Sequence, residues 1–459
     1  MKCSLITQLH HTAMYSLTKR NLLRSTLMMT LLCCIFHLPA LSHSNASDDL
    51  GATMNAIAES YVKLALALGR HDPDYVDAYH GPEAWGAEAR TELKPLPQIE
   101  TSARDLAERV TALAVPPEFD TLLSLRHVYL RQQLLSLAAR AEMLQGKHFT
   151  FDEESAALYN AVSPSFTGEH YDSLLQDLDS LLPGEGPIQR RYELFRKGFV
   201  IPLDRLDTVF STAINECRTR TRRYCPLPAG ENFTVEYVNN KPWTGYNWYK
   251  GNSHSLIQVN TDQPLYIDYA LHLAAHEGYP GHHVYNALME EHLVRQRGWV
   301  EFSVYALFSP QSLIAEGTAN FGVDVVFPDQ EKIAFERNVL FPLARIDTSN
   351  AAHYYTIQDR VKKLSYAGND AARQYLDGEM SREDAIRWLS RYSLSTRSKA
   401  QQRLAFIEKY RSYVINYNLG QDLVRRYVEQ QGGTEDHPGK RWEVFVTLLS
   451  SPRLPSGLR

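Results

Sequence analysis

The segment HLAAHEGYPGHH, from His272 to His283, contains four of the 17 histidines of the chain. Within it, His276-Glu277 resembles the start of the HExxH helix of zinc proteases. In that helix two histidines four residues apart bind the metal, and the glutamate polarises a water molecule. Here the residue four positions after His276 is Pro280, which cannot be a ligand. The cluster therefore predicts a metal site whose second histidine lies at another spacing.

Three histidines are candidates for the position beside His276. His272 is four residues earlier, so the two would share one face of a regular helix. On a regular helix His283 falls about 20° from His276 around the axis, but about 10.5 Å along it. His282 would reach the metal only if the helix were broken. Pro280 favours such a break, because proline removes a backbone hydrogen bond and clashes with the preceding turn.

A further ligand is expected from elsewhere in the chain, with one position left open for water. Glu316 is the candidate, because it lies in the apolar run LIAEGTANFGVDVV, where a carboxylate needs a partner. The small residues of this run predict a helix that approaches the histidine segment closely. Asp324, two turns further on, is a candidate for a supporting role.

HEGYPGHH followed by AEGTANFG resembles the bacterial family called domain of unknown function 885, whose members carry an HExxPGH motif and then an EGWALY-like segment. The resemblance covers nearly the whole chain after residue 44, including FDEESAALYN, FVIPLDRLDTVFSTAINECRTRT, LPAGENF and RSYVINYNLG. The family is grouped with the gluzincin-type metallopeptidases, which have mostly helical folds. The resemblance therefore implies a zinc metallopeptidase.

By this resemblance His276, His282 and Glu316 correspond to the metal ligands, and Glu277 to the general base. The family pattern fixes the first of the two adjacent histidines, which favours His282 over His283. The implied cofactor is Zn²⁺.

Some positions depart from the family pattern. Thr318 stands where the family has tryptophan, Phe321 where it has tyrosine, and the late PGQA segment reads RSYV over 411–414. Tyr417 matches the tyrosine of that late segment. Its hydroxyl could stabilise the oxyanion of a tetrahedral intermediate, or its ring could simply pack in the interior.

Most of the chain shows apolar residues at helical spacing. This spacing predicts helices over 49–70, 117–146 and 202–221, a helix that begins at 167, a capped helix after Ser381, and one uninterrupted helix over 398–430. The exception is 232–260, which alternates and is rich in Val, Thr, Tyr and Trp. We therefore expect a mainly α, zincin-like single domain over 45–459 with two or three short strands beside the metal-binding helix.

The strands also suggest how a substrate is held. SLIQVN, over 255–260, is the candidate edge strand that would pair with an extended peptide backbone, or it is an ordinary sheet strand. Trp243, Tyr246, Trp248 and Tyr249 are candidates to line a cleft or to cover the core.

Residues 1–44 contain four basic residues and no acid, and the stretch over 26–41 is apolar but shorter than the roughly 20 residues of a membrane span. This pattern indicates a secretory signal peptide, cleaved near Ser42–Ser44, or an uncleaved membrane anchor. Cys217 and Cys225 are the only cysteines beyond it, and we expect them either to form a disulfide, if the protein is exported, or to remain two free thiols. The formal net charge of −5 disfavours a nucleic-acid partner.

Taken together, the sequence predicts an exported, periplasmic or secreted zinc hydrolase that acts on a peptide or a small amide. Glu277 would take a proton from the attacking water, and Zn²⁺ with Tyr417 would hold the oxyanion. Two alternatives remain, namely a hydrolase of non-peptide amides or esters at the same site, and a non-catalytic binding protein on the same fold. No stable membrane insertion is expected after signal cleavage.

Overall fold

The computed structural model describes residues 40–115, 120–241 and 243–459. Residues 54–459 form one compact unit, and the residues up to 53 form another. Helices account for 66% of the chain and strands for 7%, which confirms the mainly α class. The expected signal peptide lies outside the described residues except for residues 40–44, which begin the first described helix.

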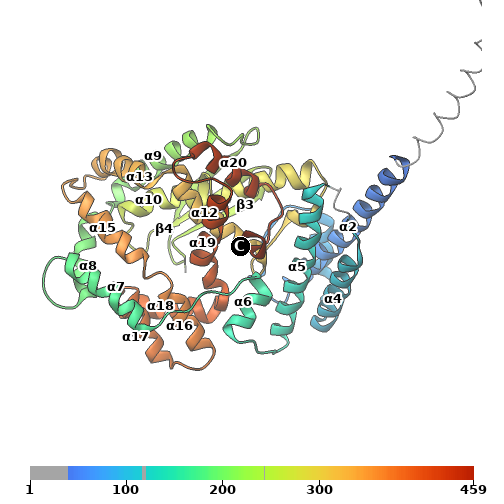
Figure 1. Ribbon diagram of the computed structural model, residues 1–459. Coiled ribbons are helices and arrows are strands. Elements are labelled where there is room, and N and C mark those ends of the chain that lie inside the picture. The colour runs from blue at the N-terminus through green and yellow to red at the C-terminus, as the bar shows by residue number, and fades with distance from the viewer. Residues whose placement is uncertain (1–39, 116–119, 242) are drawn as a thin grey trace, which may run out of the picture. The chain divides into compact units, whose positions relative to one another are not determined.

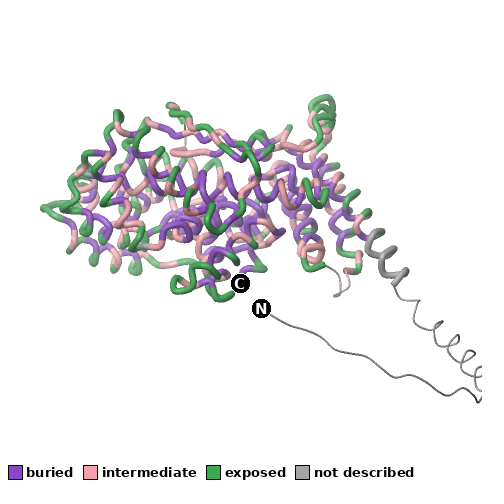
Figure 2. Tube along the Cα trace, turned by 90° about the horizontal axis from the view of Figure 1, so that it is seen from above, coloured by how far each residue is buried: buried purple, intermediate pink, exposed green. Residues whose placement is uncertain are grey.

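Within residues 54–459 the helices pack on one another and on the few strands, with buried residues inside and exposed ones on the outer turns (Figure 1, Figure 2). Their bounds are α2 Ala40–Leu68, α3 Glu83–Thr91, α4 Leu96–Ala112, α5 Thr121–Leu144, α6 Phe151–Tyr159, α7 Gly168–Leu181, α8 Ile188–Arg196, α9 Leu203–Arg222, α10 Ile267–Leu273, α11 His282–Met289, α12 Pro310–Val326, α13 Asp329–Phe335, α14 Phe341–Leu343, α15 Ala351–Lys362, α16 Ala367–Leu376, α17 Arg382–Tyr392, α18 Arg397–Tyr410, α19 Ile415–Gln430 and α20 Pro438–Leu449.

Several of the predicted helices are confirmed. α7 follows Thr167, α9 follows Pro202, and the Ser381 hydroxyl accepts a hydrogen bond from the Asp384 N–H at the start of α17. The predicted helix over 117–146 corresponds to α5, which Asp120 caps, while its expected start at Pro117 lies outside the described residues. Local capping and apolar spacing thus identified these elements correctly.

The predicted continuous helix over 398–430 is wrong. The chain breaks at Arg411, where φ is 52°, and forms a 3₁₀ turn, η6 (Arg411–Val414), between α18 and α19. The buried Glu154 carboxylate holds this turn by accepting hydrogen bonds from the Arg411 guanidinium and from both the N–H and the hydroxyl of Ser412. These charge-assisted bonds offset a backbone conformation that side chains usually avoid.

The strands predicted over 232–260 are confirmed as β2 (Asn232–Val238), β3 (Gly245–Gly251) and β4 (His254–Asn260). β4 is the central strand, parallel to β2 with Asn232 opposite His254, and antiparallel to β3 with Gly245 opposite Val259. Of the two interpretations of the segment over 255–260, the free edge strand is therefore wrong and the ordinary sheet strand is confirmed, because both of its edges are already paired. β3 is an edge strand of this sheet.

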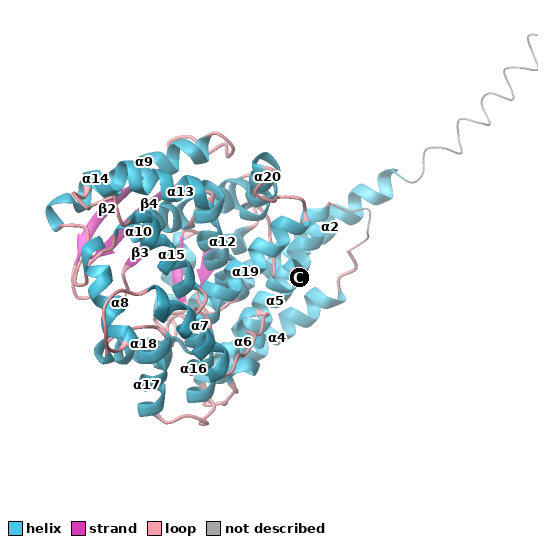
Figure 3. Ribbon diagram, turned by 60° about the vertical axis from the view of Figure 1, so that its left-hand side comes forward, coloured by secondary structure: helices cyan, strands magenta, loops and turns pink. Residues whose placement is uncertain are grey.

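A second, two-stranded sheet pairs β1 (Val76–Tyr79) with β5 (Val304–Ala306) in antiparallel register, with a bulge between Val76 and Ala78. Both β1 and the helix α11 contact β3. Figure 3 shows the strands lying among α9, α10 and α12. The sheets thus form the wall against which the histidine segment packs.

The predicted disulfide between Cys217 and Cys225 is absent. Both are free, buried thiols, Cys217 on α9 and Cys225 shortly after it. Burial raises the pKa of Cys225 to about 12, so this thiol is a packing residue rather than a reactive one.

The helices α12 and α19 pack closely against each other and lie side by side (Figure 1). A Cβ atom on Gly317 would lie 2.5 Å from the carbonyl carbon of Gly420, and one on Gly420 would lie 2.8 Å from the Leu313 carbonyl oxygen. Two facing glycines therefore allow the backbones of α12 and α19 to touch. This contact fixes the position of Glu316, which precedes Gly317 on α12.

We predict that Gly317→Ala destabilises the protein by about 3 kcal/mol or more, because the clash is with backbone that cannot rotate away. Gly439→Ala is the control, since a Cβ there meets open space on α20 and alanine favours a helix by up to about 1 kcal/mol. Denaturant unfolding of the two variants gives the comparison. Equal stability of the two variants would show that the α12–α19 contact adjusts freely.

Candidate metal centre

The helix carrying His276 ends in an irregular turn. α10 passes into a π-helical segment, η2 (Ala274–Gly278), the peptide bond between Tyr279 and Pro280 is cis, and α11 begins at His282. A Cβ atom on Gly281 would lie 1.8 Å from the His276 carbonyl oxygen, so only glycine fits there. The break expected from Pro280 is confirmed, and it brings the backbone after Pro280 against that of His276.

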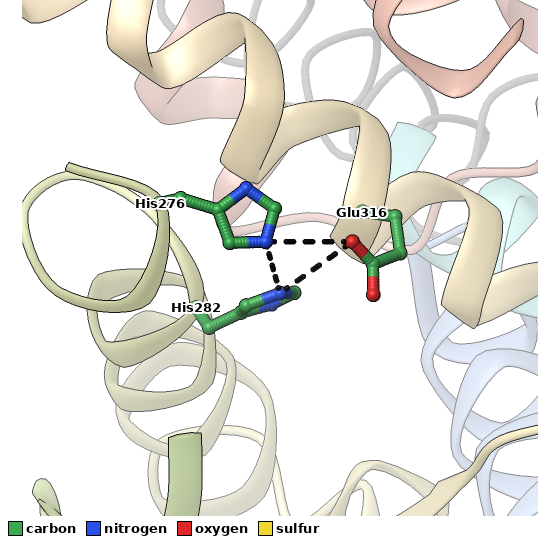
Figure 4. Close-up of side chains that lie close together, drawn as sticks. All are labelled: His276, His282 and Glu316. Carbon is green, nitrogen blue, oxygen red and sulfur yellow. Dashed lines mark hydrogen bonds and ion pairs between the residues drawn. The ribbon is translucent and has the colours of Figure 1, made fainter. Parts of the chain in front are cut away.

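As a result, His276, His282 and Glu316 lie together (Figure 4). The two imidazole Nε2 atoms are 3.2 Å apart, and Glu316 Oε2 lies 3.5 Å from His276 Nε2 and 3.8 Å from His282 Nε2. One ligand atom from each side chain falls within 4.8 Å of the others. Two imidazole nitrogens and one carboxylate oxygen form a donor set that catalytic zinc sites use.

The state of Glu316 fits a cation at this position. Its Oε1 accepts a hydrogen bond of 2.9 Å from the Tyr413 hydroxyl, whereas its buried Oε2 has no hydrogen-bond partner in the described chain. Burial raises the pKa of Glu316, but the two imidazoles outweigh it and hold this pKa far below its ordinary range. The carboxylate is therefore charged, buried and short of one partner, which a metal ion would supply.

Glu277 lies beside this cluster without belonging to it. Its side chain lines the same cavity, and its carboxylate packs against β3, where a Cβ on Gly245 would lie 3.1 Å from Glu277 Oε1. The Asn247 side-chain amide donates a hydrogen bond of 2.7 Å to the backbone carbonyl of Glu277. Burial raises the pKa of Glu277 to about 7. A carboxylate with this pKa is suited to accept and return a proton near neutral pH.

His283 points away from the cluster, into a buried hydrogen-bond network. Its Nε2 donates to Glu231 Oε2 at 3.0 Å, and its Nδ1 accepts from the Ser255 hydroxyl at 2.9 Å. Glu231 also accepts from the hydroxyl of Tyr279 and from the guanidinium of Arg218. This network holds both flanks of the Pro280–Gly281 break in place, so His283 supports the cluster from behind.

His272 also stays outside the cluster. Its ring stacks on that of His276 at a centroid distance of 5.4 Å and lines the cavity. The buried His276 Nδ1 has no hydrogen-bond partner in the described chain, and the stacked His272 ring packs against this imidazole. Of the three candidates beside His276, the structure brings only His282 to Glu316.

The cluster opens into a cavity of about 480 Å³. Tyr417, Trp243 and Tyr246 line it, as the sequence suggested, but Trp248 and Tyr249 do not. Asp324 is also absent from its lining and instead accepts from Gln421 and Arg425 of α19.

Tyr413 and Asp77 are among the cavity residues that the sequence did not lead us to expect. Tyr413, in the η6 turn, donates to Glu316, and it became accessible to this role only through the unpredicted break at Arg411. Asp77, on β1, accepts a hydrogen bond from the Tyr246 hydroxyl, and burial raises its pKa to about 6. The RSYV segment carried a signal for Tyr413, whereas nothing in the local sequence marked Asp77.

We predict that His276→Ala, His282→Ala and Glu316→Ala each abolish zinc binding, while His283→Ala weakens it by about 10- to 100-fold, as the loss of supporting contacts does elsewhere. His272→Ala is the matched control and should keep its zinc, because it lines the cavity without entering the cluster. Zinc content and affinity of the five folded variants decide the assignment. A zinc-free His272→Ala with a zinc-replete His282→Ala would reverse it.

The Glu231 network gives a prediction for acid stability. Although burial raises the pKa of Glu231, hydrogen bonds from His283, Tyr279 and Arg218 lower it to about 2. Since the folded pKa lies below the unfolded value, Glu231 stabilises the fold above about pH 4.5 and loses this effect as the pH falls towards 2. The contribution is on the order of 1–3 kcal/mol.

The difference in free energy of unfolding between the native protein and Glu231→Gln should therefore shrink as the pH falls from about 5 to about 2. Glu236→Gln, exposed on β2, is the control for loss of a carboxylate. Chemical denaturation at a series of pH values measures both differences. A Glu231→Gln difference that stays constant over this range would contradict the network.

No family model matches the chain, and no curated protein matches it. Among solved structures, it is similar to a candidate lipoprotein from Colwellia psychrerythraea at 15% identity and a TM-score of 0.47, over 80% of this chain and 66% of that one. It is also similar to a candidate lipoprotein of unknown function from Shewanella oneidensis at 13% identity and a TM-score of 0.42, over 82% of this chain and 75% of that one. The chain thus spans just under two thirds of the first of these proteins.

Proposed function

We propose that the protein is an exported zinc-dependent hydrolase that cleaves peptide bonds. The observation that carries this proposal is the convergence of His276, His282 and Glu316 at the wall of a cavity that Glu277 also lines. The donor set matches that of catalytic zinc, and the neighbouring carboxylate has a pKa suited to proton transfer. The resemblance to the domain of unknown function 885 family supports the same assignment.

A zinc ion held by these three residues would act as a Lewis acid and lower the pKa of a water molecule. Glu277 would then accept a proton at its carboxylate and deliver it to the leaving amine. Its burial against Gly245 suits this role, because a partly neutral carboxylate at pH 7 can both take up and release a proton.

Tyr417 is the candidate for stabilising the developing oxyanion. It lines the cavity, and its hydroxyl has no hydrogen-bond partner in the described chain, so it is free to donate to a substrate. Tyr413 already donates to Glu316 and would keep that carboxylate oriented instead. The two tyrosines, whose rings meet edge to face at 5.8 Å, would therefore have separate roles.

β3 is the candidate for aligning a peptide backbone. The Thr244 carbonyl accepts a hydrogen bond from the Asn260 N–H of β4. Because neighbouring residues of an antiparallel strand point their backbone groups to opposite edges, the N–H and C=O of Gly245 point away from β4. Gly245 also lines the cavity beside Glu277. An extended substrate could add to this edge and present its scissile bond to the cluster.

Export is proposed from the basic and apolar pattern of residues 1–44. Among the residues that the structure describes, no helix has both the length and the apolar content to cross a membrane. Mass spectrometry of secreted or periplasmic protein should find an N-terminus near Ser42–Asn45, and a full-length cytosolic product would contradict export.

We predict that Glu277→Gln keeps its zinc but loses at least about 100-fold in kcat, because the amide cannot accept the proton. Glu236→Gln on β2 is the control and should retain both zinc and activity. Turnover is measured by mass spectrometry of a peptide-library digest, beside a panel of non-peptide amides and esters. Near-native turnover by Glu277→Gln would refute the mechanism, and cleavage of the non-peptide panel alone would refute the peptidase assignment.

A further inference from the structure

One cationic side chain of the cavity lacks a counter-ion. Arg403, on α18, is the only arginine or lysine among the described residues that line this cavity. It is half-buried, and within the described chain it forms neither an ion pair nor a hydrogen bond. Its guanidinium carbon lies 5.1 Å from the centroid of the Phe406 ring, and a Cβ atom placed on Gly368 would lie 3.8 Å from its Nη2 atom.

This lack of a partner is unusual for a desolvated arginine. Burial lowers the pKa of Arg403, so the site makes its positive charge less favourable. Other buried or half-buried arginines of the described chain have a polar partner, as Arg126 has in Glu301 and Arg411 has in Glu154. A guanidinium that faces a cavity without such a partner is suited to bind an anion that enters the cavity.

Arg403 lines the same cavity as His276, His282 and Glu316 of the candidate metal centre. Burial raises the pKa of Tyr417, the Glu316 and Glu277 carboxylates add to this rise, and the Arg403 guanidinium opposes it. The Tyr417 phenol is therefore within electrostatic reach of Arg403 and of both carboxylates. One small substrate could contact the metal centre and Arg403 at the same time.

The charges in the cavity are unevenly distributed. Glu316 belongs to the cluster itself, and the carboxylates of Asp77 and Glu277 line the cavity with it, so a substrate anion would be repelled from this part of the cavity. Arg403 supplies the opposite charge. A substrate that carries a carboxylate would thus bind in a single orientation, with its carboxylate at Arg403 and its scissile amide bond at Glu277.

We propose that Arg403 binds the C-terminal carboxylate of a short peptide, which makes the protein a carboxypeptidase or a dipeptidase. This inference rests on the proposed function, because it assigns the substrate class of the same site. The cavity volume of about 480 Å³ suits a small ligand, and its aromatic walls, including Trp243, Tyr269, Phe406 and Tyr410, suit an apolar or aromatic side chain.

The test is a binding measurement, which does not depend on turnover. Full-length Glu277→Gln protein is titrated calorimetrically with N-benzoyl-glycyl-phenylalanine and with its C-terminal amide, in the presence of zinc. We expect the free acid to bind about 10- to 100-fold more tightly than the amide, as one charge-assisted hydrogen-bonded pair provides. Adding Arg403→Met should remove this preference by weakening the acid alone, and Arg403→Lys should restore part of it.

Lys399→Met is the matched control, because it removes one positive charge from the same helix outside the cavity. It should leave the preference for the acid intact. Equal binding of acid and amide by the Arg403-containing protein would overturn the inference, and so would an equal preference in Arg403→Met.

A third ligand separates the two sources of a carboxylate. The amidated peptide N-benzoyl-glycyl-glutamic acid α-amide carries its only carboxylate on a side chain. Tight, Arg403-dependent binding of this ligand at the level of the free acid would overturn the assignment to the C-terminus. Failure of the native protein to cleave any peptide would count against the proposed function, while the calorimetric comparison would still decide the role of Arg403.

Discussion

The candidate site depends on one contact within the chain, that between Gly281 and the carbonyl group of His276. No side chain fits at residue 281, because a Cβ would overlap that carbonyl oxygen at 1.8 Å. The contact lets the backbone return after Pro280, so that His282 faces His276 although six residues separate them. α12 then packs against the same turn through Gly322, where a Cβ would lie 3.2 Å from Pro280 Cγ. Backbone proximity, rather than helical spacing, therefore places Glu316 opposite the two histidines.

Buried carboxylates around the site fall into two kinds. Glu231 and Glu154 accept several hydrogen bonds each, and both hold a turn that a helix alone would not form. Glu316 and Glu277 are different, since one has an oxygen without a hydrogen-bond partner and the other has a pKa raised to about 7. Fully bonded carboxylates stabilise the surrounding structure, whereas incompletely bonded ones retain the capacity to bind or to accept a proton.

The sequence predicted those features that depend on local chemistry. Residue types and spacings within about 30 residues predicted the histidine cluster, the proline break, the capped helices and the three strands. The structure has each of these features. The order of the strands was not predictable in this way, because β4 became central through a parallel pairing with β2 that no hairpin turn dictates. The break at Arg411 was missed for a similar reason, since it depends on Glu154, which lies 257 residues away from it in sequence. Asp77 and Arg403 reach the cavity from opposite parts of the chain, and only the fold reveals them.

The contacts that hold the candidate ligands in place also indicate how metal binding and folding are linked. The Glu231 network and the α12–α19 contact hold Glu316 beside two imidazoles whose Nε2 atoms face each other at 3.2 Å. The chain makes these contacts itself, so they would lower the cost of ordering the ligands when an ion binds. Binding to the folded state alone would in turn stabilise that state in proportion to the logarithm of the free ion concentration. The glycine contacts and the buried carboxylate network would therefore contribute to metal affinity although none of their atoms touches the ion.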